Sequence, residues 1–181
     1  MSVYRFKKAA VLGAGVMGAQ IAAHLANAGV PVVLFDLPAD GRDKNAIVNK
    51  ALANLGKLSP SPLASKALVN NIQAGNYDEN LALLADCDVI IEAIAERLDW
   101  KKSLYAKILP FVGPKAILAS NTSGLSINAL SEVLDESLHH RFCGLHFFNP
   151  PRYMHLVELI PCAKTDVDVL TSLETFLVST L

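Results

Sequence analysis

One segment constrains the fold of this chain more than any other. Residues 11–18 read Val-Leu-Gly-Ala-Gly-Val-Met-Gly, which is a GxGxxG pattern. It follows an apolar run, 9–12, that is typical of a buried strand, and it precedes small residues, 19–28, that predict a helix. A second apolar run, 32–35, predicts a strand that ends at Asp36. A strand, a glycine-rich turn, a helix and a strand ending in an acidic residue form the pattern of a dinucleotide-binding βαβ unit.

The three glycines have separate physical roles in such a unit. Gly13 permits the tight turn out of the strand, Gly15 lets the backbone approach a pyrophosphate, and Gly18 lets the helix pack close to the sheet. The helix N-terminus then offers free N–H groups and a partial positive charge to the phosphates. We therefore expect the cofactor to lie against Gly13, Ala14, Gly15, Val16, Met17 and Gly18.

Asp36 predicts which dinucleotide is bound. Its carboxylate is placed to accept both hydroxyls of the adenosine ribose, and each such charge-assisted hydrogen bond contributes about 1.5–3 kcal/mol. The same charge repels a 2′-phosphate, so NAD is expected rather than NADP. The alternative is three packing glycines and an unrelated strand-end aspartate, and the strand-turn-helix-strand context favours the cofactor site.

The rest of the chain alternates apolar runs with amphipathic stretches. Strands are expected at 71–74, 89–91, 117–119, 142–148 and 156–160, and helices at 45–55, 61–69, 98–109, 127–134 and from 165 onward. This repetition predicts an α/β fold: a Rossmann-type, doubly wound, mostly parallel sheet with helices on both faces. Residues 1–181 are expected to form one NAD-binding domain.

Composition excludes several classes of protein. Lys and Arg number 16 against 17 Asp and Glu, which argues against a basic surface for nucleic acid. A hydrophobic fraction of 52% excludes disorder and requires either a sheet covered on both faces or an apolar surface with another purpose. The uncharged stretch 9–35 is interrupted by glycines and polar residues, so no membrane span is expected.

Cysteine and histidine spacing excludes two further classes. The three cysteines, Cys87, Cys143 and Cys162, have no CxxC spacing, which argues against a disulfide scaffold and indicates a reducing compartment. The five histidines form no HExxH motif, so no metal site is expected.

Residues able to do chemistry follow the predicted strands, where loops of a parallel sheet face the cofactor crevice. An isolated His146 between apolar neighbours is most often a core histidine. Glu158, also flanked by apolar residues, must find a cation, a donor or water, because burying a carboxylate unpaired is costly. If the two residues lie on neighbouring strands, the carboxylate would set the imidazole tautomer and make it a better general base.

Three motifs, Ser120–Ser123, Gly144–Pro150 and Val157–Glu158, closely resemble those of the NAD-binding domain of L-3-hydroxyacyl-CoA dehydrogenases. The resemblance runs from the glycine loop to the last predicted strand. It implies NAD-dependent oxidation of L-3-hydroxyacyl-CoA to 3-ketoacyl-CoA in fatty-acid β-oxidation. The stretch Pro150–Met154 looks most like bifunctional members, in which an enoyl-CoA hydratase unit is fused to the dehydrogenase.

The resemblance also implies roles for individual residues. His146 would take the proton of the 3-hydroxyl group, Glu158 would orient it, and Ser123 would hydrogen-bond the substrate oxygen beside the nicotinamide. The remaining implied contacts are Asn149 at the nicotinamide end, Glu96 and Lys101 against NAD, and Lys50 and Lys57 as candidates for acyl-CoA, although a solvated helix face explains the last two equally well.

Members of this family continue into an all-helical domain that completes the acyl-CoA pocket and makes the dimer contact. This sequence stops at Leu181, so we expect that domain to be absent, a homodimer to depend on it, and turnover by this chain to be poor. The first predicted strand begins at Ala9, which leaves no room for a transit peptide and predicts a cytoplasmic location.

Two other classes of protein remain as alternatives. A dehydrogenase of the 6-phosphogluconate type shares the glycine loop but places a catalytic lysine in its second domain, and the pairing of His146 with Glu158 argues against it. A non-catalytic dinucleotide-binding module would not need polar side chains at several strand ends.

Overall fold

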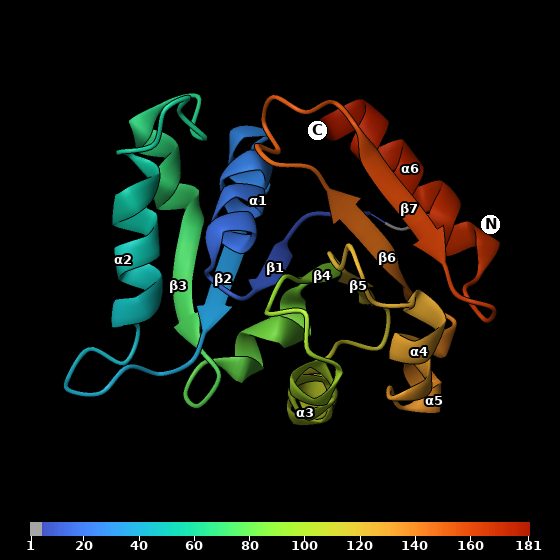
Figure 1. The fold of residues 1–181 in the computed structure, drawn as a ribbon. Coiled ribbons are helices and arrows are strands. Elements are labelled where there is room, and N and C mark those ends of the chain that lie inside the picture. The colour runs from blue at the N-terminus through green and yellow to red at the C-terminus, as the bar shows by residue number, and fades with distance from the viewer. Residues whose placement is uncertain (1–4) are drawn as a thin grey trace.

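The protein is built on one seven-stranded sheet with the strand order β3-β2-β1-β4-β5-β6-β7 (Figure 1). The computed structural model describes residues 5–181, and residues 1–4 of the predicted domain lie outside the described residues. The strands are β1 Ala9–Leu12, β2 Val32–Asp36, β3 Ile72–Asn76, β4 Val89–Glu92, β5 Ile117–Ser120, β6 Phe142–Phe147 and β7 Val157–Pro161. The first six are parallel and β7 is antiparallel to β6, so the predicted mostly parallel, doubly wound sheet is confirmed.

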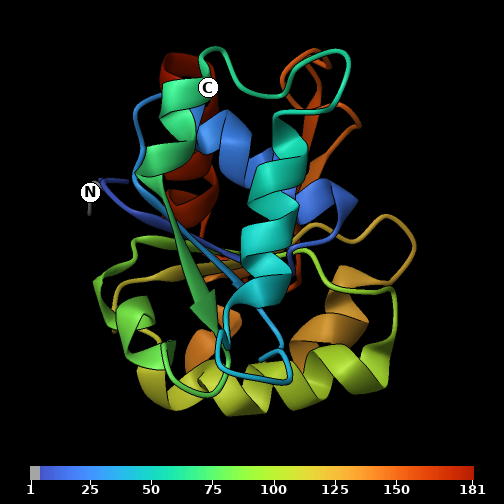
Figure 2. The same cartoon turned by 90° about the vertical axis from the view of Figure 1, so that its left-hand side faces the viewer.

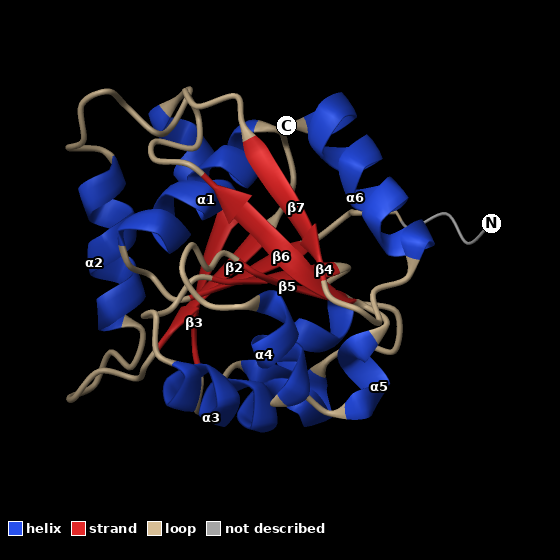
Figure 3. Ribbon diagram, turned by 45° about the vertical axis from the view of Figure 1, so that its right-hand side comes forward, coloured by secondary structure: helices blue, strands red, loops and turns tan. Residues whose placement is uncertain are grey.

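Helices cover both faces of this sheet (Figures 2 and 3). They are α1 Val16–Asn27, α2 Ala46–Leu55, α3 Leu98–Ile108, α4 Ile127–Glu132, α5 Glu136–His139 and α6 Val167–Thr180, with short 3-10 turns at Lys66–Asn71, Leu81–Asp86 and Leu109–Phe111. Helices α1, α2 and α6 pack on one face, and α3, α4 and α5 pack on the other. This arrangement accounts for the apolar composition, because parallel strands buried on both faces are apolar on both sides.

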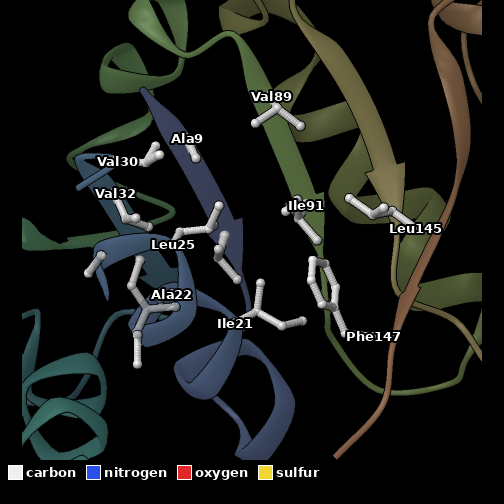
Figure 4. Packing of buried hydrophobic residues seen from close by; sticks show 14 of the residues in the cluster. Ala9, Ile21, Ala22, Leu25, Val30, Val32, Val89, Ile91, Leu145 and Phe147 are labelled. Atoms are coloured by element: carbon white, nitrogen blue, oxygen red, sulfur yellow. The ribbon is translucent and has the colours of Figure 1, made fainter. Parts of the chain in front are cut away.

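Alternate side chains of each strand enter different cores. In β1, Ala9 and Val11 face the α1 side, while Ala10 and Leu12 face the α3 side, and all four are fully buried. Figure 4 shows the first of these cores, where Ile21, Ala22 and Leu25 of α1 pack against one face of the sheet, in the same cluster as Phe147 at the end of β6. The two cores hold the strand ends, and therefore the loops that leave them, in fixed positions.

The predicted helix over 61–69 is wrong. Ser61 does not cap a helix, because its hydroxyl donates to the Leu63 carbonyl over 2.8 Å. The backbone oxygens of this segment are instead used in long-range contacts: Arg152 Nη1 donates to the carbonyls of Ser61 and Leu63, and Asn27 donates to that of Pro62. Carbonyls used in this way are not available to close helical turns, and only the 3-10 turn Lys66–Asn71 forms.

Of two helix starts predicted from the sequence, that of α4 is confirmed and that of α6 lies two residues later than expected. Ser126 caps α4 as expected, because its hydroxyl accepts from the N–H of Ala129 at 3.3 Å. The last helix begins at Val167 rather than near Thr165, whose hydroxyl donates to the Phe142 carbonyl at 2.6 Å and is thereby committed to β6.

The three cysteines are buried and free. Burial raises the pKa of Cys87 to about 11 and that of Cys143 to about 12, so neither thiol ionises at neutral pH.

Candidate active site

The glycine loop has the backbone that its sequence predicts. Gly13 has φ +104°, which favours glycine, and a Cβ there would lie 2.8 Å from the carbonyl oxygen of Ala93. A Cβ on Gly18 would overlap the carbonyl of Gly13, so the close approach is to the turn itself as well as to the sheet. A Cβ on Gly15 would meet nothing within 4 Å. The loop is therefore packed at its two ends and open in the middle, beside the N-terminus of α1, and it fits the pyrophosphate of NAD.

Asp36 at the end of β2 lies against this loop. Its Oδ2 accepts the N–H of Ala14 at 2.6 Å, and its Oδ1 accepts the N–H of Leu37 at 2.7 Å. Each carboxylate oxygen has a second lone pair, so both can still accept a ribose hydroxyl. The structure thus brings Asp36 to the expected edge of the site, and the ribose contact remains a prediction.

A buried ionic network occupies the end of β4. Glu92, fully buried, accepts from Lys101 Nζ at 2.5 Å, from Tyr105 OH at 2.9 Å and from Ser120 Oγ at 2.7 Å, and also from the N–H of Ile94. Burial, with the charge of Glu92, raises the pKa of Tyr105 well above its usual value, so this phenol is a donor. Lys101 is itself fully buried and directs its ammonium group at carboxylates. Sequence reasoning anticipated Lys101 as a cofactor contact; that remains a prediction, and the structure shows an ion pair.

Glu96 holds the loop that carries Ser123. Its Oε2 accepts from Thr122 Oγ1 at 2.6 Å, and its Oε1 accepts the N–H of Ser123 at 2.7 Å and the Ser123 hydroxyl at 3.3 Å. Burial raises the pKa of Glu96, but the hydrogen bonds from Thr122 and Ser123 together with Lys101 outweigh burial and lower it. The carboxylate is therefore charged at neutral pH and fixes the loop after β5.

His146 and Glu158 meet as predicted. They are directly opposite in the β6–β7 pair, and the His146 Nδ1 lies 2.9 Å from the Glu158 Oε2. With Nδ1 donating to the carboxylate, Nε2 is the nitrogen left for another group. The Glu158 side chain is 49% exposed, because β7 is an edge strand, whereas that of His146 is 16% exposed.

The face on which His146 lies follows from the alternation of side chains along β6. Its neighbours Leu145 and Phe147 enter the α1-side core, so His146 points to the α3–α4 side. The loop with Ser123 leads into α4 on this same side, and Asn121 Oδ1 in that loop accepts the N–H of Phe147 at 2.8 Å. The loop after β5 is thereby tied to the end of the strand that carries His146.

Asn149, exposed just beyond β6, is tied to α1 by a residue that sequence reasoning missed. The buried Gln20 donates from Nε2 to Asn149 Oδ1 at 3.1 Å and to the Val16 carbonyl at 3.2 Å. The available signal for Gln20 was a polar side chain among the small and apolar residues of the first two turns of α1.

Two cavities surround these elements. A hollow of about 430 Å³ between the glycine loop and α2 is lined by Gly15, Gln20 and Lys50, among others, whereas Lys57 follows the end of α2 and does not line it. A larger hollow of about 720 Å³ is lined by Val157 and Leu159 of β7 and by α6. Side chains alternate along β7, so this larger hollow is on the opposite face from Glu158 and is not the site.

Two classes of feature are absent from residues 5–181. No helix there is long and apolar enough to cross a membrane. Nor does this part of the chain group three or more histidine, cysteine or acidic side chains in a way that would hold a metal ion.

The doubly wound sheet, the glycine loop with Asp36 beside it, and the polar groups at the neighbouring strand ends define a cofactor-binding domain of the dehydrogenase class. The chain belongs to the 3-hydroxyacyl-CoA dehydrogenase family: residues 8–180 match the family described as "3-hydroxyacyl-CoA dehydrogenase, NAD binding domain". This membership sets aside the alternative of the 6-phosphogluconate type.

Individual relatives agree with this family. The chain is 47% identical over 176 residues to a protein of Rickettsia felis named a fatty acid oxidation complex trifunctional enzyme, covering 97% of this chain and 24% of the relative. It is 44% identical over 179 residues to a protein of Deinococcus radiodurans named a 3-hydroxyacyl-CoA dehydrogenase, covering 98% and 51% respectively. The crystal structure of 3-hydroxybutyryl-CoA dehydrogenase from Escherichia coli superposes with a TM-score of 0.80 at 30% identity, over 97% of this chain and 36% of that one. The chain thus spans about a quarter of the first of these curated relatives and about half of the second.

Proposed function

We propose that this chain is the cofactor-binding part of an enzyme that oxidises L-3-hydroxyacyl-CoA to 3-ketoacyl-CoA with NAD, in fatty-acid β-oxidation. The observation that carries the proposal is the 2.9 Å contact between His146 Nδ1 and Glu158 Oε2 at the carboxyl end of β6. The names of the relatives, which include fatty acid oxidation and 3-hydroxyacyl-CoA dehydrogenase, support the substrate class.

His146 acts as the general base in this proposal. Oxidising a secondary alcohol removes a proton from the hydroxyl oxygen and a hydride from the carbon that bears it. Bound NAD would supply the acceptor for that hydride. The proton moves to Nε2 of His146, and Glu158 stabilises the imidazolium that forms. General-base assistance of this kind is worth about 10²–10⁴ in rate.

Ser123 stabilises the substrate oxygen as its charge develops. Its hydroxyl bond to Glu96 is 3.3 Å long, which is weak for an O–H donor, so the hydroxyl is free to turn towards a substrate. The stronger bond from the Ser123 N–H to the same carboxylate keeps the residue in place. One well-placed donor lowers the activation barrier by about 3 kcal/mol.

The predicted cofactor contacts are the glycine loop, Asp36, Asn149, Glu96 and Lys101. For Lys101 we propose an indirect contribution through its ion pair with Glu92, since its ammonium group is fully buried. Lys50 lines the hollow beside the glycine loop and is the better supported of the two lysines proposed for acyl-CoA; Lys57 has no such support.

The chain is proposed to work within a larger protein. The relative named a trifunctional enzyme contains a matching segment as about a quarter of its length. A fused enoyl-CoA hydratase, a homodimer and a cytoplasmic location remain predictions from the sequence. The isolated chain is expected to oxidise 3-hydroxybutyryl-CoA poorly, and robust steady-state turnover would contradict that expectation.

The test is His146→Gln in the 181-residue chain, with His155→Gln as the control, because His155 is an exposed histidine in the loop after β6. Single-turnover reduction of acetoacetyl-CoA by NADH, with protein in excess, should fall at least 100-fold in His146→Gln, while the Kd for NADH changes less than twofold. The control should retain both. An equal loss of NADH binding and reduction would make His146 structural, and NADH binding without any effect of acetoacetyl-CoA would indicate a non-catalytic dinucleotide-binding module.

A further inference from the structure

A single buried side chain, Gln20, connects the two ends of the proposed cofactor site. It lies in the second turn of α1 and is 7% exposed. One amide proton of its Nε2 goes to the carbonyl of Val16, the first residue of α1, and the other goes to Asn149 Oδ1 beyond β6. Val16 belongs to the phosphate loop and Asn149 to the predicted nicotinamide end, so one side chain contacts both.

The donor pattern determines which way Asn149 faces. An asparagine amide has one oxygen that accepts and one nitrogen that donates. Gln20 donates both Nε2 protons, one of them to Asn149. The Asn149 oxygen is therefore turned towards α1, and the NH₂ group of Asn149 is turned away. Asn149 is itself exposed, so its two N–H donors are accessible to a ligand at the protein surface.

We propose that Gln20 is a positioning residue for Asn149, holding its amide so that the site offers hydrogen-bond donors, and not acceptors, to an oxygen at the nicotinamide end of NAD. This inference rests on the proposed role of Asn149. It makes α1 the element that fixes the distance between the phosphate site and the nicotinamide site.

The test measures the Kd for NADH in single and double variants of the 181-residue chain. Asn149→Ala establishes the role of Asn149 and should weaken binding about tenfold, the value of one hydrogen bond. Gln20→Met keeps the side-chain length without the donors and should weaken binding about fivefold. Gln20→Glu offers only acceptors at neutral pH, which turns the Asn149 oxygen outward, and should weaken binding more than Gln20→Met.

The double variant shows whether Gln20 acts through Asn149. In the Asn149→Ala background, Gln20→Met should cause no further loss, because residues that act through one another are not additive. A loss that persists in that background would mean that Gln20 acts on the helix or directly on the phosphates, and the inference would be overturned. If Asn149→Ala alone leaves the Kd unchanged, the proposed role of Asn149 fails and the inference fails with it, whereas the His146 test is unaffected.

Asn27→Ala is the matched control. Asn27 is an amide on the same helix, but it contacts Pro62 and Ala64 instead of the site. Its loss should lower the melting temperature and leave the Kd for NADH within twofold. A second readout needs no cofactor: the side-chain amide NMR signals of Asn149 should move towards those of a free asparagine in Gln20→Met, because its oxygen no longer accepts a hydrogen bond. Unchanged Asn149 signals in that variant would overturn the proposal, whatever its affinity for NADH.

Discussion

Removing the ammonium group of Lys101 should destabilise the domain strongly. Lys101→Met leaves the buried carboxylate of Glu92 without its cation, and the neutral donors that remain to it are the N–H of Ile94 and the hydroxyls of Tyr105 and Ser120. Breaking a buried pair by removing one partner costs about 3–5 kcal/mol. A domain of this size loses about 2–4 °C of melting temperature per kcal/mol, so Tm should fall by about 6–20 °C.

A second variant separates charge from packing. Glu92→Gln combined with Lys101→Met replaces both charges by neutral side chains of similar size, and it should recover at least half of the lost Tm because no buried charge is left unpaired. The exposed pair Arg97–Asp99, at 2.9 Å, is the control, and Asp99→Asn should leave Tm unchanged within error. Thermal unfolding followed by circular dichroism measures all three. If Lys101→Met has the Tm of the parent protein, or if the double variant is no more stable than the single one, an unpaired Glu92 carboxylate is not what destabilises the domain.

Three further predictions concern the cofactor loop and the strand ends. Asp36→Ala should weaken NADH binding about tenfold and bring the Kd values for NADH and NADPH closer together in parallel fluorescence titrations. An unchanged ratio of the two Kd values would refute the ribose contact. Gly18→Ala should prevent stable folding, because its Cβ overlaps backbone, whereas Gly15→Ala should keep the parent Tm and weaken NADH binding, because its Cβ enters the open space left for the pyrophosphate; equal Tm losses would contradict this. Because the pKa of Glu96 is lowered in the folded protein, its contribution to stability is complete above the ordinary glutamate pKa and is lost as pH falls through the lowered pKa. Urea unfolding between pH 7 and pH 3 should therefore show a larger loss of stability in the parent than in Glu96→Gln, and equal losses would contradict this.

Local features of the molecule followed from the sequence because they depend on a few neighbouring residues. The glycine loop needs a positive φ at Gly13 and no side chain at Gly18, and glycine is the residue type that meets both requirements. The buried strands could be read from apolar runs, since a sheet covered on both faces tolerates little else. The contact of His146 with Glu158 could also be predicted from the sequence, because the two residues lie opposite each other on adjacent antiparallel strands.

The sequence by itself therefore determined the fold class, the cofactor loop and most of the proposed catalytic groups. Only the tertiary structure decided how the site is held together: the burial of Lys101 against Glu92, the hydrogen bond from Gln20 to Asn149, and the failure of a helix to form at Ser61, whose carbonyl is taken by Arg152. Except for the Lys101–Glu92 pair, these contacts join residues far apart along the chain. Backbone preferences act over one turn and leave a readable pattern, whereas a contact between distant residues exists only after the layers have packed and set which polar groups meet.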